Sequence, residues 1–162
     1  AIVWEHNTHI GDARATDMRR ADMVNVGQIV RERHAEDGVV LVGFGSHRGS
    51  VVAADGWGEP MLIMSLPEAQ PGSWEEVLHR TETADKLLLL DDLRPYAAAR
   101  QRRGHRAIGV VYHPRQERGN YVPTDLPARY DAFVYVDESM ALHPLHLEPN
   151  VSTPPETYPW GV

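Results

Sequence analysis

Apolar residues occur along this chain in short runs, separated by polar, glycine-rich or proline-rich stretches. A short continuous apolar run bounded by turn residues is typical of a buried strand. Where apolar residues instead recur at three- and four-residue steps, an amphipathic helix is favoured. The apolar runs predict strands over residues 1–4, 39–44, 50–54, 86–90, 107–112 and 132–136.

Three helices are predicted between these strands. The first covers residues 22–34, and Gly38 follows it at a position that suits the left-handed conformation found just after helix ends. The second covers residues 73–81, because its first four residues form a Ser-x-x-Glu capping box. The third covers residues 95–104, with a proline at its start and a glycine after its end.

The alternation of strands and helices predicts an α/β fold with a mainly parallel sheet flanked by helices. A turn over residues 45–49 would pair the two strands beside it as antiparallel neighbours, so we expect a mixed sheet. Residues 55–72 are rich in glycine and proline and are predicted to form a loop. The chain opens directly on a strand-like run, so we expect an incomplete domain over residues 1–146 and a proline-rich tail over residues 147–162.

Composition narrows the classes of partner. The 162 residues carry a net charge of −7, and binding to nucleic acid depends on Lys and Arg that neutralise phosphates, so we expect no nucleic-acid partner. The basic run 100–106 is expected at the solvated end of the third helix. Cysteine is absent, which excludes disulfides, thiolate nucleophiles and Cys-ligated metals. Neither a signal peptide nor an apolar stretch of roughly 18 residues is present, so we expect a cytoplasmic protein without membrane contact.

Candidate chemistry is concentrated in residues 4–14, where polar side chains follow the first predicted strand. In open α/β sheets ligands bind beyond the carboxyl ends of strands, so this segment is expected to line a site. His6 and His9 are candidate catalytic residues, because imidazole acts as acid, base or ligand near neutral pH. The alternative is that both are loop histidines held by ordinary hydrogen bonds.

The charged neighbours of these histidines have two interpretations each. Glu5 precedes His6 and would point to the opposite side of an extended segment, so it either supports the site from behind or faces solvent. Asp12 could hold a histidine tautomer, and Arg14 could neutralise an anionic substrate or intermediate. Alternatively, Asp12 and Arg14 form an ion pair that braces the loop.

A metal site in this segment is a weaker hypothesis. Glu5, His6 and His9 do not match the His-Glu-x-x-His pattern on a helix, and any such site would need further ligands. We therefore expect no metal, and no nucleotide cofactor either, because the chain has no glycine-rich phosphate loop. A metal-dependent hydrolase that uses His6 and His9 stays an alternative.

Residues 4–14 read Trp-Glu-His-Asn-Thr-His-Ile-Gly-Asp-Ala-Arg, and further motifs follow them in order. These motifs occupy residues 25–28, 42–44, 49–54, 71–75, 78–79, 106–112 and 130–133. Together they resemble the erythromycin esterase-like hydrolases, and the resemblance extends over residues 1–146. It implies that residues 1–146 are the C-terminal part of a longer domain of that family.

The resemblance implies hydrolysis of a small-molecule ester or lactone by attack of water. His6 and His9 map onto the family's active-site pair, which implies that they orient the carbonyl, stabilise the oxyanion or transfer a proton. His79 falls in a motif that contains a histidine in the family, so it is a candidate pocket residue.

The general base is expected in an N-terminal part outside this sequence, so this chain alone should be weak or inactive. The chain could act with an N-terminal companion segment or as a homo-oligomer. A non-catalytic homologue that only binds its ligand is the remaining alternative.

Overall fold

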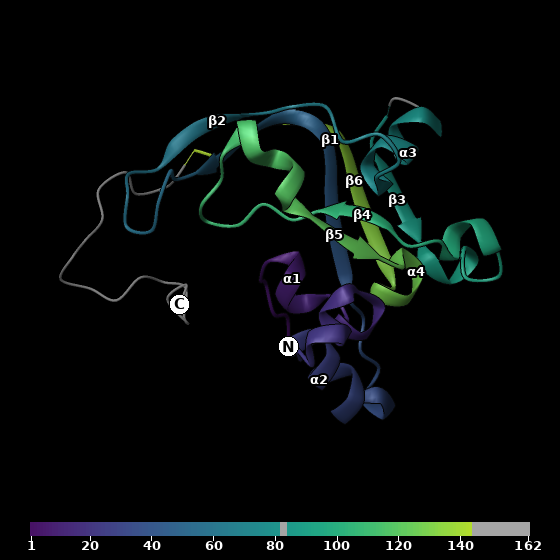
Figure 1. The fold of residues 1–162 in the computed structure, drawn as a ribbon. Coiled ribbons are helices and arrows are strands. Elements are labelled where there is room, and N and C mark those ends of the chain that lie inside the picture. Colours follow the sequence, from purple (N-terminus) through teal and green to yellow (C-terminus); the bar gives the residue numbers. More distant parts are fainter. Residues whose placement is uncertain (82–83, 144–162) are drawn as a thin grey trace.

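The structure, a computed structural model, describes residues 1–81 and 84–143 (Figure 1). Its strands are β1 (Val42–Ala53), β2 (Leu62–Leu66), β3 (Lys86–Leu89), β4 (Arg103–Arg106), β5 (Tyr121–Thr124) and β6 (Ala132–Ser139). Its α-helices are α1 (Asn7–Ile10), α2 (Val26–Arg33), α3 (Trp74–Thr81) and α4 (Leu126–Arg129). Short 3-10 helices cover Ala13–Ala15, Asp17–Ala21, Ala35–Asp37, Leu90–Asp92, Ala97–Arg100 and Pro114–Asn120.

The main sheet has the strand order β2-β1-β6-β3, and β4 and β5 form a separate two-stranded ribbon. The prediction of a mixed sheet is confirmed, because β1 and β6 are parallel while β1–β2 and β3–β6 are antiparallel. The prediction of a mainly parallel sheet is wrong for these strands. The β1–β2 pair is antiparallel because β2 follows β1 after a short loop, whereas parallel neighbours require a long crossover connection.

The predicted turn over residues 45–49 does not form, because β1 runs straight through it. The first part of β1 pairs with β6, and its last part, from Gly49 to Ala53, pairs with β2. The glycines here permit close packing instead of a turn, since a Cβ on Gly45 would lie 2.7 Å from the Phe133 ring. The strand β2 lies within residues 55–72, which the sequence predicted as loop.

Three other predicted elements are absent. Residues 1–4 form no strand and are exposed, and Trp4 packs on Phe44 with 5.4 Å between ring centroids. Residues 107–112 form only an isolated bridge to Ala54, because β1 ends at the residue before it. The helix predicted over residues 95–104 is reduced to a 3-10 turn, since β4 pairs with β5.

Several predictions are confirmed with changed boundaries. The Ser73 half of the capping box is present, with the Ser73 hydroxyl accepting from the Glu76 backbone N–H at 3.2 Å, and α3 ends at Thr81 as expected. The Glu76 carboxylate accepts from the Gly72 N–H at 3.0 Å instead of from the Ser73 N–H. The first helix is shorter than predicted because Asn25 caps it, accepting from Gln28 N–H at 3.0 Å. Gly38 has the expected left-handed conformation. The strands β3 and β6 match those predicted over residues 86–90 and 132–136.

The main core lies between one face of the sheet and helices α3 and α4 (Figure 1). Its buried residues are Leu41, Trp74, Leu78, Leu90, Leu126, Tyr130, Phe133 and Tyr135. The segment with α1 and α2 attaches at the end where β1 begins, and there Arg31 forms a bidentate ion pair with Asp131 at 2.8 Å. Within the described residues no helix is long and apolar enough to cross a membrane. The predicted tail over residues 147–162 lies outside the described residues.

Candidate active site

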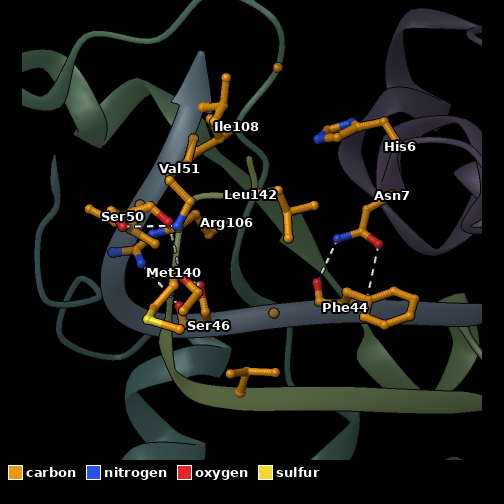
Figure 2. A pocket seen from close by; sticks show the side chains of 17 residues that line it. His6, Asn7, Phe44, Ser46, Ser50, Val51, Arg106, Ile108, Met140 and Leu142 are labelled. Carbon is orange, nitrogen blue, oxygen red and sulfur yellow. Dashed lines mark hydrogen bonds between the residues drawn. The ribbon is translucent and has the colours of Figure 1, made fainter. Parts of the chain in front are cut away.

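A pocket of about 440 Å³ lies between the start of α1, the strand β1 and the segment that follows β6 (Figure 2). His6 and Asn7 form one wall. The apolar part of the remaining wall comprises Phe44, Val51, Val52, Leu66, Ile108, Val136, Met140, Ala141 and Leu142, and its hydroxyl groups are those of Ser46, Ser50 and Ser139. Arg106 also lines the pocket, but its guanidinium is occupied by Glu117 and by backbone carbonyls of Ser46, His47 and Pro67. His6 is the one histidine among the described residues that line the pocket.

His6 is held in one orientation because it caps α1. Its Nδ1 accepts from the Thr8 backbone N–H at 3.4 Å and lies 2.8 Å from the Thr8 hydroxyl. In a neutral imidazole whose Nδ1 accepts, the proton resides on Nε2. Burial lowers the pKa of His6, the Ile108 backbone partly opposes this, and the nearby His9 lowers it further. His6 is thus a neutral ring near pH 7 whose hydrogen-bonding neighbours are Thr8 and the Ile108 backbone.

His9 lies at the other end of α1 and is exposed. Its ring centroid is 6.4 Å from that of His6, with the two rings nearly perpendicular. The structure therefore brings the two predicted catalytic histidines together, although only His6 lines the pocket.

The charged residues of the same segment lie elsewhere. The Asp12 carboxylate accepts from Arg14 at 2.7 and 3.0 Å and from Arg31 at 3.2 Å. Burial alone would raise the pKa of Asp12, but these hydrogen bonds outweigh it and the pKa is lowered. Of the two interpretations given for Asp12 and Arg14, the structure shows the ion pair that braces the loop. The described contacts of Asp12 and Arg14 include neither His6 nor His9. Glu5 is exposed.

His79 lies between α3 and the sheet rather than in the pocket. Its Nδ1 is 2.7 Å from the Asp137 carboxylate, and its ring stacks on His47 at 3.8 Å between centroids. His47 is only 4% exposed, and burial followed by the neighbouring His79 lowers its pKa. The stacking of His47 on His79 is therefore more stable when the His47 ring is neutral than when it is protonated.

We expect the protein to lose stability as the pH falls below about 6.5, the pKa of a histidine in an unfolded chain. Because the pKa values of His6 and His47 are lowered by folding, the unfolded state binds more protons below that pH. Each group contributes a slope of at most about 1.4 kcal/mol per pH unit until its folded pKa is passed. Urea unfolding between pH 7.5 and 5.5 measures this loss.

The variant His47→Asn should flatten that pH dependence, because it removes one of the two groups. His34→Asn, at an exposed histidine, is the matched control and should leave the slope unchanged. Equal slopes in the wild type and His47→Asn would contradict the assignment.

The structure also reveals a buried pair that the sequence did not indicate. Glu75 and His105 are both 0% exposed, and the His105 Nδ1 lies 2.6 Å from the Glu75 carboxylate. The sequence predicted His105 at a solvated helix end, which is wrong because β4 turns it inward. One signal was available for Glu75, since it lies three residues before Leu78 and so on the buried face of α3.

Metal-ligating side chains do not gather in the part of the chain that the structure describes. No group of three or more His, Asp or Glu residues lies close enough there to hold one ion.

The chain is similar to known proteins over most of its length. The family model described as erythromycin esterase matches residues 1–139. A succinoglycan biosynthesis protein of known structure matches 85% of this chain with a TM-score of 0.67 and 21% identity. A Bacillus cereus protein of known structure matches 86% with a TM-score of 0.69 and 17% identity. This chain covers 33% of either structure, so it spans about a third of the length of these relatives.

Proposed function

Because the chain belongs to the erythromycin esterase family, a family of ester hydrolases, we propose that it forms one wall of an ester- or lactone-hydrolysing active site. In this proposal His6 donates a hydrogen bond from Nε2 to the carbonyl oxygen of the substrate. Water adds to the carbonyl carbon, the bond to the leaving oxygen breaks, and that oxygen takes up the proton that the water gave to the base.

The observation that carries the proposal is the state of His6. A donor stabilises an oxyanion best when it is fixed before the reaction and excluded from bulk water. The Thr8 contacts fix the ring, and its lowered pKa keeps it neutral. In a neutral imidazole whose Nδ1 accepts, Nε2 carries the proton, and that N–H is the group that can donate to the oxyanion.

The aliphatic wall supports the same proposal. A pocket lined by valine, leucine and isoleucine accepts the hydrocarbon part of an ester or lactone, and the described lining includes no Asp, Glu or Lys that would select a charged substrate. The general base is proposed to come from a part of the protein outside this chain, which spans only a third of its solved relatives. His9 stays a prediction as a second catalytic group.

The test is hydrolysis by the complete protein that contains this chain. p-Nitrophenyl acetate, p-nitrophenyl butyrate and an unsubstituted δ-lactone serve as probes, and we expect turnover of at least one that persists in EDTA and 1,10-phenanthroline. Activity that these chelators abolish and zinc or manganese restores would favour the metal-dependent alternative. Binding of the lactone without turnover would contradict the proposal and favour a ligand-binding homologue.

A further inference from the structure

The buried Glu75–His105 pair lies directly behind the segment that carries His6. Glu75 projects from α3 and His105 from β4, so two separate elements meet there. The same oxygen of Glu75 that faces His105 also accepts from the Arg106 backbone N–H at 2.9 Å. These contacts hold the carboxylate in one position relative to the imidazole.

The carboxylate determines which nitrogen of His105 carries the proton. Nδ1–H donates to Glu75 at 2.6 Å, which leaves Nε2 of a neutral ring as an acceptor. Nε2 lies 3.2 Å from the Tyr130 hydroxyl and 3.4 Å from the side-chain nitrogen of Asn7, and both of these groups can donate to it.

Asn7 is thereby fixed with its NH₂ group toward His105. In that orientation the amide also donates to the Phe44 carbonyl at 2.6 Å and accepts from the Phe44 N–H at 3.1 Å (Figure 2). Arg129 donates to the Asn7 backbone carbonyl at 3.0 Å. Asn7 is therefore held through both its side chain and its backbone, and His6 is the residue directly before it.

We propose that Glu75 and His105 are positioning residues that orient Asn7 and, through it, the His6 ring in the pocket. The proposal rests on the function proposed above for His6. A carboxylate that fixes the tautomer of a histidine, which then fixes a group at the site, is the arrangement that tunes ligand geometry in other enzymes. Here the group that His105 fixes is Asn7, which is next to the proposed oxyanion donor His6.

A purely structural role explains the pair less well. Burying a carboxylate and an imidazole costs desolvation, and apolar side chains of similar volume often stabilise a core as much or more. The Phe44 backbone selects one orientation of the Asn7 amide, and an apolar pair could not reinforce that choice. Hydrogen bonds of fixed direction can, because only one orientation places the NH₂ group against an accepting Nε2.

The experiment uses the complete protein with ¹⁵N-labelled histidine and the isosteric variant Glu75→Gln. In the wild type, NMR should show His105 protonated on Nδ1 and His6 on Nε2. In Glu75→Gln the His105 tautomers should mix, and the His6 resonances should broaden or split. Glu76→Gln is the matched control, because it removes a carboxylate from the next position of α3, where it binds Gly72 N–H and Arg80.

Kinetics provide the second readout. Glu75→Gln should lower kcat about 10- to 100-fold, the range seen when groups that orient active-site ligands are removed, while KM changes less than about threefold. Asn7→Ser should lower kcat without altering the His105 tautomer. The double variant Glu75→Gln/Asn7→Ser should have a kcat only slightly below that of either single variant, because both changes interrupt the same contact between His105 and Asn7.

The outcomes separate this inference from the proposed function. If no probe is hydrolysed, the proposed function fails, and the NMR signals of His6 still decide whether Glu75 positions it. Unchanged His6 signals in Glu75→Gln would overturn the inference, as would additive losses of kcat in the double variant. Should Glu75→Gln not fold, a wild-type His105 protonated on Nε2 would equally overturn it.

Discussion

Replacing His6 with alanine is expected to lower kcat of the complete protein about 100-fold or more, the effect of removing one oxyanion donor. KM should change much less, because the donor acts most strongly when negative charge develops on the carbonyl oxygen. The apolar pocket wall that would hold the substrate stays in place in this variant. Steady-state kinetics with p-nitrophenyl butyrate and the δ-lactone measure both parameters.

His34→Ala is the matched control for that prediction, because His34 is exposed and pairs only with Asp37 among the described contacts. It should retain full activity. A His6→Ala protein that folds and turns over like the wild type would eliminate His6 as the donor. A proportional rise in KM with unchanged kcat would instead assign His6 to substrate binding.

The largest expected loss of stability comes from Gly49→Ala. Gly49 lies within β1 with φ of 129°, a conformation that L side chains rarely adopt. A Cβ there would also lie 1.9 Å from the Ser139 carbonyl oxygen, which is backbone of β6 and cannot rotate away. Strain and overlap together should cost about 2–4 kcal/mol, measured as the shift in free energy of unfolding in urea.

Two other glycines separate the causes of that loss. Gly58 has φ of 79° but open space around it, so Gly58→Ala should report backbone strain alone, at about 1 kcal/mol. Gly109 has neither feature, and Gly109→Ala should change stability by less than about 0.5 kcal/mol. A Gly49→Ala protein as stable as Gly109→Ala would show that β1 and β6 do not approach each other as described.

The parts of the fold that the sequence predicts well are those specified by local chemistry. The Ser73 capping box defines the start of α3 because donor and acceptor are three residues apart. The turn over residues 45–49 was mispredicted because glycine has two uses, and only the distant Ser139 and Phe133 show that close packing is the one used here.

In the candidate site, too, the sequence predicts the residues that local spacing defines and misses those that distant contacts bring together. His6 and His9 lie three residues apart and could be recognised from their own segment. The support behind them joins Glu75 to His105 and His105 to Asn7, which are 30 and 98 residues apart. No local spacing encodes such contacts, and in the sequence His105 stands in a basic run that reads as solvent-exposed.

The Asn7 amide has a consequence for solubility as well as for the site. The first part of β1 has β6 along one side only, so at Phe44 its other side would present an unpaired N–H and C=O. Unpaired strand edges recruit strands from other molecules and begin aggregation. The amide makes both hydrogen bonds that an added strand would make there. A single side chain thus covers the edge of β1 at Phe44 while it anchors the segment that carries His6.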